Sequence, residues 1–183
     1  VFLFILVGAA VDTGLIATLA NALEGAILNG RDLFALSDQG TMLFAAILVL
    51  WVAGALSAVM DNIPFVAVSI PIVGALGVAL PGDGRVLWWA LSLGACLGGN
   101  GTPIGASANV TTLGLAERAG IRITFREFMG TGVPVMLFTL LVSTIFLSGY
   151  VALGPDEVAQ VGGVILAVAL VALWRYEVAA AHR

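Results

Sequence analysis

The stretch "LSLGACLGGNGTPIGASANV", residues 91–110, is apolar at both ends and unsuited to helix in its middle. Its central run "GGNGTPIG" consists of four glycines, a proline, an asparagine, a threonine and an isoleucine, most of which are poor helix formers. The flanking apolar segments, residues 86–97 and 106–116, are each too short to cross a bilayer, because a spanning helix needs about 20 residues. We therefore predict one transmembrane span that is interrupted at its centre.

The composition of the chain predicts an integral membrane protein. Hydrophobic residues make up 61% of the sequence and charged residues 10%, with a mean hydropathy of +1.12. Soluble domains average about 45–50% apolar residues, glycine included, and about 25% charged residues. The chain has no lysine, its formal net charge is -4 and its pI is about 4.7, so it lacks the basic surface that nucleic acid requires.

Four further segments have the length and apolarity of spans, and a shorter one follows them. They are residues 1–19, 41–59, 65–80 and 128–147, then 158–174. The segment 21–40 is polar, and we expect it outside the hydrocarbon core. The loop 117–127 holds three of the seven arginines, which predicts that it is cytoplasmic, with the turn at 81–85 on the other side. Because the sequence opens inside an apolar run, we expect it to be part of a longer protein.

The polar turn "MDNIP", residues 60–64, joins two apolar arms, and two interpretations of this hairpin stay open. Either both arms cross the membrane and the turn is aqueous, or the hairpin is re-entrant and its tip stops inside the membrane. Pro64 disfavours helix at Ile63, which suits a tip in both cases.

The two interruptions carry the polar side chains that we single out as candidate substrate or ion ligands. They are Asp61, Asn62, Asn100, Thr102, Ser107 and Asn109, together with the backbone of Gly101. Non-helical backbone persists at membrane depth only where it is buried in protein or lines a cavity, and secondary transporters bind substrate at such breaks. Carboxylate, amide and hydroxyl oxygens suit a small cation, whereas the N–H groups of a following helix suit an anion. The alternative is that the breaks are only kinks.

Asp61 is the residue whose burial in a membrane would cost the most free energy, because it carries a charge. A carboxylate at such a position indicates a functional site. Every arginine of the sequence lies in a predicted loop or tail, so no basic partner is evident. We expect the charge to be satisfied by a bound cation, a proton, or an arginine from elsewhere in a longer protein.

The segments "LSAVMDNIPFVAVSIPIV", residues 56–73, and "LGACLGGNGTPIGASANVTTLGLAERAGIRITFREF", residues 93–128, resemble the ion transporter superfamily. The nearest branch contains the arsenite permeases, the pink-eyed dilution protein and the D-type sodium/proton antiporters; the citrate and dicarboxylate carriers are more distant. The resemblance covers residues 1–147 and implies the C-terminal half of an inverted repeat, with one re-entrant hairpin and one broken helix. Residues 148–183 would add a transmembrane helix and a polar tail.

The resemblance also implies roles for particular residues. Asp61, Asn62 and Ile63 stand where the dicarboxylate carriers have Ser-Asn-Thr, so only the asparagine carries over, and the added charge argues against dicarboxylate specificity. Residues 100–105 match the unwound stretch and would share a coupling-ion site with the tip, which for sodium means Asp61, Asn62, Asn100 and Thr102. Asp12 in "VGAAVDTGLI" matches an acidic residue of relatives and is a candidate for proton handling, its alternative being a helix–helix hydrogen bond.

These observations predict a secondary active permease for a small anion such as arsenite or a carboxylate, working by alternating access. A sodium/proton antiporter and a non-transporting membrane subunit are the alternatives. We expect no enzyme activity and no organic cofactor, with sodium or a proton as coupling ion. Expected partners are a small inorganic or organic anion, the missing N-terminal half, the lipid bilayer and a second copy in a homodimer, but no nucleic acid. The expected location is a bacterial or archaeal inner membrane.

Overall fold

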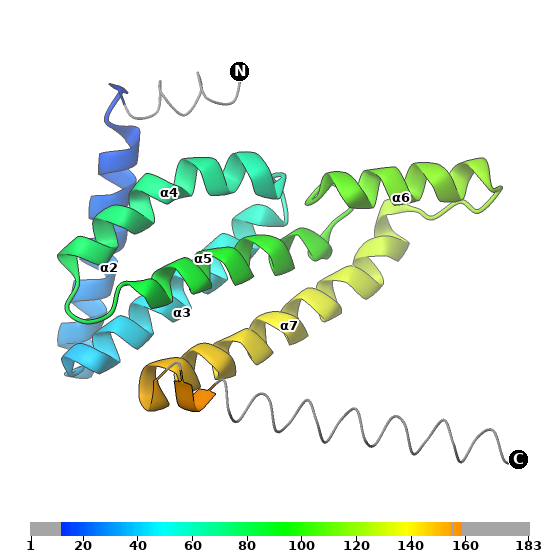
Figure 1. Ribbon diagram of the computed structural model, residues 1–183. Helices are drawn as coiled ribbons and strands as arrows, with labels where there is room; N and C mark the ends of the chain where they lie inside the picture. Colours follow the sequence, from blue (N-terminus) through cyan, green and yellow to red (C-terminus); the bar gives the residue numbers. More distant parts are fainter. Residues whose placement is uncertain (1–11, 155, 159–183) are drawn as a thin grey trace, which may run out of the picture.

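A computed structural model describes residues 12–154 and 156–158, and all regular structure in these residues is helical (Figure 1). The elements in chain order are α2 (Leu15–Phe34), α3 (Asp38–Ser57), α4 (Asn62–Ala79), α5 (Arg85–Gly98), the short 3-10 helix η1 (Gly99–Gly101), α6 (Ser107–Arg118) and α7 (Phe125–Leu153). Helices α3, α4 and α7 are long and apolar enough to cross a membrane. The prediction of an all-α polytopic membrane protein is confirmed.

Most helix boundaries follow the hydropathy of the sequence. The predicted arms at 41–59 and 65–80 are α3 and α4, and the two short segments at 86–97 and 106–116 are α5 and α6. At its start α7 has a capping box, in which the Thr124 hydroxyl accepts from the N–H of Glu127 and the Glu127 carboxylate accepts from the N–H of Thr124. Helix α7 extends six residues beyond Leu147, whereas the predicted last span at 158–174 lies outside the described residues except for Val158.

Helix α2 differs from the expectation for the N-terminal part of the chain. It runs from the predicted span at 1–19 into the polar segment at 21–40 without interruption. The break lies earlier, at Gly14, whose φ of 74° is in the left-handed region. The change at Leu19 is therefore a change in polarity and not in secondary structure, because a helix depends on backbone hydrogen bonds that polar side chains do not prevent. Residues 1–11 of the predicted span lie outside the described residues.

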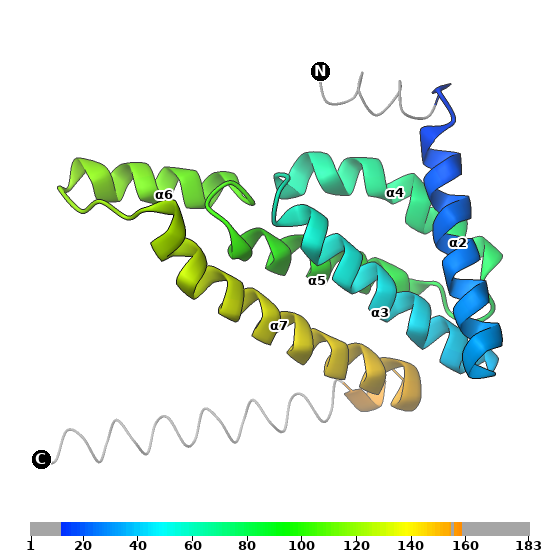
Figure 2. The ribbon, with the colours of Figure 1, turned by 180° about the vertical axis from the view of Figure 1, so that it is seen from behind.

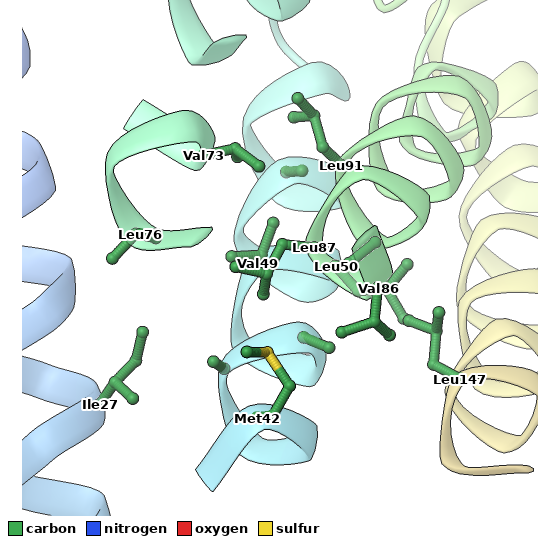
Figure 3. Close-up of a cluster of buried hydrophobic side chains, with 14 of the residues drawn as sticks. Ile27, Met42, Val49, Leu50, Val73, Leu76, Val86, Leu87, Leu91 and Leu147 are labelled. Carbon is green, nitrogen blue, oxygen red and sulfur yellow. The ribbon is translucent and has the colours of Figure 1, made fainter. Parts of the chain in front are cut away.

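Helices α3 and α4 form a hairpin, and α5 runs alongside α3 at close range (Figures 1 and 2). Glycines permit this approach: a Cβ atom at Gly94 would lie 2.5 Å from the Leu50 carbonyl oxygen, and one at Gly98 would collide with the backbone of Gly54. Large side chains fill the other end of the interface. The buried cluster of Figure 3 joins five helices through Ile27 of α2, Met42, Val49 and Leu50 of α3, Val73 and Leu76 of α4, Val86, Leu87 and Leu91 of α5, and Leu147 of α7.

The contacts between α3 and α7 give the position of the hairpin tip along α7. The Gln39 side chain donates to the Val151 carbonyl over 2.6 Å, and the Trp51 indole donates to the Thr144 hydroxyl over 3.1 Å. Further toward the C-terminal end of α3, the tip residue Ala58 lies beside Met136 of α7. Both side chains would be within 4 Å of a Cβ atom at Gly101. Met136 is about 16 Å from the start of α7 at 1.5 Å per residue.

Helix α7 has 29 residues and is about 43 Å long, which exceeds a 30 Å hydrocarbon core, so its start does not mark the membrane surface. The tip ends well before the start of α7, and α6 occupies the remaining length (Figure 1). Both interpretations of the hairpin, a re-entrant tip and two complete spans with an aqueous turn, therefore stay open.

Candidate functional site where the hairpin tip meets the broken helix

The hairpin tip is built around an N-cap at the start of α4. The Asp61 carboxylate accepts from the backbone N–H of Ile63 over 3.3 Å, which satisfies one of the free donors at the helix end. Pro64 lies in the first turn, where its missing N–H has no partner in any helix. The expected restriction on Ile63 does not hold, because α4 already begins at Asn62. The tip is therefore a short turn at residues 58–61 that leads directly into the start of α4.

The break follows from Pro103 together with its glycines. In a continuous helix the carbonyl of Gly99 would accept from the N–H of residue 103, which a proline lacks. The side chain of Asn109, in the first turn of α6, replaces that donor. Its amide donates to the carbonyls of Gly99 over 2.8 Å and of Thr102 over 3.0 Å. Asn109 thus holds the unwound backbone in place from the far side of the break.

The tip and the break meet directly through Asp61. Its second carboxylate oxygen accepts from the backbone N–H of Ser107 over 3.2 Å and from the hydroxyl of the same residue. Ser107 is the first residue of α6, so one carboxylate lies at the N-termini of both α4 and α6. Helix N-termini carry partial positive charge and favour an anion. Two helix ends and a hydroxyl are thus partners of Asp61 that the sequence did not suggest, while a bound cation, a proton or an arginine stays a prediction.

Asn62 makes a second connection on the buried side of the tip. The side-chain amide of Asn62 faces oxygen atoms, which need a donor. Its orientation is therefore assigned from the hydrogen-bond network, with the nitrogen toward these oxygens. The nitrogen then donates to the Gly105 carbonyl over 3.1 Å and to the Ser57 hydroxyl over 2.6 Å. Ser57 in turn donates to the Ala95 carbonyl over 2.6 Å. This chain of bonds links α3, α4, α5 and the break.

Thr102 makes the third connection. Its hydroxyl donates to the carbonyl of Ala58 in the tip and accepts from the N–H of Gly105 over 3.0 Å. The Ala58 carbonyl thus accepts from Thr102 of the break, and the Gly105 carbonyl accepts from Asn62 of the tip. The tip and the break form one hydrogen-bonded unit, and we call the set Asp61, Asn62, Thr102, Ser107 and Asn109 the junction cluster.

Three of the residues singled out in the sequence lie outside the junction cluster. The Asn100 side chain is exposed, and Gly101 is buried against α7. Asp12 is exposed at the edge of the described residues, far along the chain from the tip. Of the four residues named for sodium, no two are joined by a hydrogen bond between their side chains, and Asp61, Asn62 and Thr102 each bond to other protein groups.

Sequence reasoning missed four residues that contact the junction. Ser57 and Ala58 bond to it from the end of α3, and both lie inside the quoted motif at 56–73. Gly132 and Met136 of α7 pack against the break. The small-residue run "GTG" at 130–132 was the available signal for this contact, since small residues mark close helix packing in membranes.

Comparison with known proteins identifies the family. A family model described as "Citrate transporter" matches residues 1–94 of the 183. An uncharacterized transporter of Mycobacterium bovis is 42% identical over 147 residues, which is 79% of this chain and 32% of that protein. A 46 kDa membrane protein of Mycobacterium leprae is 41% identical over the same shares of both chains. The P protein of Homo sapiens is 43% identical over 114 residues, 60% of this chain and 13% of that protein.

These matches confirm the resemblance to the ion transporter superfamily, including its pink-eyed dilution branch. The chain spans about a third of the length of the mycobacterial relatives. No solved structure matches it significantly. The family is one of transporters and not of enzymes, and together with the apolar helices it supports an integral membrane protein, for which the mycobacterial relatives fit a bacterial inner membrane. Because the family model covers more than half of the sequence, the chain belongs to the citrate transporter family.

Proposed function

We propose that the complete protein is a secondary active transporter that moves a small anion, such as arsenite or a carboxylate, by alternating access. Its family supports a carboxylate, because the family is described as citrate transporters. The Asp61 tip, which adds a negative charge where dicarboxylate carriers have serine, favours a smaller or less charged substrate. This chain supplies one hairpin and one broken helix, and the rest of the protein would supply their counterparts.

The observation that carries this proposal is the direct bonding between the hairpin tip and the broken helix. Asp61 with Ser107 and Thr102 with Ala58 join two helix interruptions through residues that are 46 and 44 positions apart in the sequence. Polar groups at membrane depth need partners, and in secondary transporters such groups bind substrate near the midplane. Groups that bond to each other in one state can exchange those bonds for a ligand at little cost in hydrogen bonding.

Sodium or a proton is the proposed coupling ion. The oxygens of Asp61, Asn62 and Thr102 are hard ligands of the type that suits sodium. Asp61 could bind it while still accepting from Ser107, and Thr102 while still donating to Ala58, because a carboxylate has about four acceptor sites and a hydroxyl oxygen two. Asn100, the fourth residue named for sodium, is exposed beside the cluster and would have to turn inward or contribute its carbonyl.

A sodium/proton antiporter is the second candidate, and Asp61 is the observation that favours it. A carboxylate at membrane depth costs at least about 2.5–3.5 kcal/mol without partners. A group that alternates between a cation, a proton and Ser107 would avoid that cost in every step of an exchange cycle. Proton handling by Asp12 is a further prediction of this candidate.

Two partners remain part of the proposal. One is an N-terminal half of similar design, and the other is a second copy in a homodimer. The exposed apolar side chains of α7, including Phe138, Leu141 and Ile145, are suited to contact lipid or such a partner.

The test is transport by the complete protein reconstituted in proteoliposomes. We expect uptake of citrate or arsenite driven by a proton or sodium gradient, and we expect Asn62→Ala to impair it because the Gly105 carbonyl loses its donor. Asn29→Ala, an exposed asparagine of α2, is the matched control and should transport normally. Sodium-dependent acidification without anion uptake would favour the antiporter. No flux of either kind would favour a non-transporting subunit and would contradict the proposal.

A further inference from the structure

Helix α7 lies directly against the unwound backbone of the break. A Cβ atom at Gly132 would lie 2.6 Å from the carbonyl oxygen of Asn100 and 3.2 Å from that of Gly101. One helical turn later, the Met136 sulfur would lie 2.5 Å from a Cβ atom at Gly101. Since real Cβ atoms essentially never come within 3.0 Å of another heavy atom, neither glycine can be replaced without movement.

Gly132 and Met136 occupy the same face of α7, because residues four apart are neighbours on a helix surface. Gly130, on the same helix and only two residues earlier, has open space around it, and a Cβ atom there would meet nothing within 4 Å. Glycine weakens a helix interior by roughly 0.5–1 kcal/mol relative to alanine. The contact with the break therefore explains the glycine at 132, whereas no contact explains the one at 130.

The carbonyls of the break divide between two supporting helices. Asn109 of α6 holds the carbonyls of Gly99 and Thr102 by hydrogen bonds. The two carbonyls between them, those of Asn100 and Gly101, accept no bond from Asn109 or from the hairpin and lie against Gly132. Carbonyl oxygens of this kind are hard ligands for a small cation. Their direction depends on how closely α7 approaches.

We propose that Gly132 and Met136 make α7 a positioning element for the break. The glycine lets α7 reach the Asn100 and Gly101 carbonyls, and the methionine fills the space beneath Gly101. Together they fix the direction of these carbonyls and hence the affinity of the junction for its coupling ion or anion. Neither residue contacts the ligand in this proposal, which rests on the proposed transport function.

The test compares Gly132→Ala with Gly130→Ala in the full-length protein in proteoliposomes. Uptake of citrate or arsenite is measured against sodium concentration and pH, alongside thermal unfolding without substrate. We expect Gly132→Ala to raise the half-saturating concentration of substrate or ion at least about tenfold, equivalent to about 1.4 kcal/mol. Gly130→Ala should stay within about twofold of wild type, as expected for an open site.

A second pair keeps the test decisive if Gly132→Ala does not fold. Met136→Leu conserves volume but changes the contact with Gly101, and Met129→Leu on the same helix is its control. An unchanged half-saturating concentration in whichever variant folds, or an equal shift in its control, overturns the positioning role. Failure of the wild-type protein to transport any of these probes would instead overturn the proposed function.

Discussion

The carboxylate of Asp61 accepts hydrogen bonds from both the backbone N–H and the hydroxyl of Ser107, 46 residues further along the chain. Asp61 precedes the first residue of α4, and Ser107 is the first residue of α6. A single negative charge is thus shared by two helix N-termini, each of which stabilises it through its dipole. Any change at Asp61 therefore acts on the hairpin and on the broken helix together.

Asp61→Asn should separate the charge of this residue from its role as a cap. Asparagine caps helices about as well as aspartate, so α4 should form and the full-length protein should express and unfold near the wild-type temperature. Without the charge, uptake should fall at least about tenfold, equivalent to about 1.4 kcal/mol, or lose its dependence on pH or sodium. Uptake into proteoliposomes across a range of pH and sodium concentrations measures this.

Asp83→Asn is the control for that variant. Asp83 also bonds to a backbone N–H two residues later, but it lies in the turn before α5 and pairs with the exposed Arg85 over 2.8 Å. An exposed ion pair contributes little, so this variant should behave as wild type. Ser107→Ala, which removes the hydroxyl from Asp61, should alter ion dependence in the same direction as Asp61→Asn. Wild-type transport by both junction variants would remove the pair from the mechanism.

Asn109→Leu should destabilise the protein, because it removes the donor to two carbonyls of the break. Leaving a buried acceptor without a partner costs about 1–3 kcal/mol. Thr112→Val is the control on the same helix, since the Thr112 hydroxyl is exposed and donates only to the Ala108 carbonyl one turn earlier. Thermal unfolding of the detergent-solubilised protein compares the two. Equal stability of both variants would mean that Asn109 does not hold the break.

Gly98→Ala tests the close approach of α3 and α5. Its Cβ atom would collide with the Gly54 backbone, so the helices must separate, at a cost typical of overpacking of about 1–3 kcal/mol. Gly74→Ala in α4 meets only the Trp88 ring at 4.0 Å and should be neutral or stabilising by about 0.4–1 kcal/mol. The measurement is the apparent unfolding temperature of each variant. A Gly98→Ala protein as stable as Gly74→Ala would contradict the packing.

The helices and the two interruptions could be predicted from the sequence because they depend on local properties. Apolar length defines α3, α4 and α7, and Pro103 with its glycines defines the break. The extent of α2 could not be predicted, since polarity marks where a helix meets water and not where it ends. Gly14, whose backbone conformation is left-handed, carried no distinctive signal among 23 glycines.

The partners within the junction could not be predicted either. That Asp61 bonds to Ser107 depends on how two distant helix ends pack, and no residue pattern near either one encodes it. The contact of Gly132 with Asn100 depends in the same way on the angle of α7. Most of the residues that meet at the junction could therefore be singled out in the sequence, whereas the bonds between them could not.

The orientation of the broken span gives the last prediction. Cysteines at Asp83 and Arg122, in a Cys96→Ala background, should label from opposite sides of the membrane with an impermeant thiol reagent. Both positions are exposed, and α5, the break and α6 separate them end to end (Figure 2). The three arginines of the loop 117–127 predict that Arg122 lies on the cytoplasmic side. Inside-out and right-side-out vesicles measure which side reacts.

A third cysteine, at the exposed Ile63 beside the tip, distinguishes a membrane-embedded tip from an aqueous turn. If the tip stops inside the membrane, this cysteine should react only slowly, and its rate should change when sodium or citrate is added. The cysteine at Arg122 provides the rate of a fully aqueous thiol for comparison. Equal and constant rates at both positions would mean that the hairpin crosses the membrane completely. Labelling of Asp83 and Arg122 from the same side would show that α5 and α6 do not form one interrupted span.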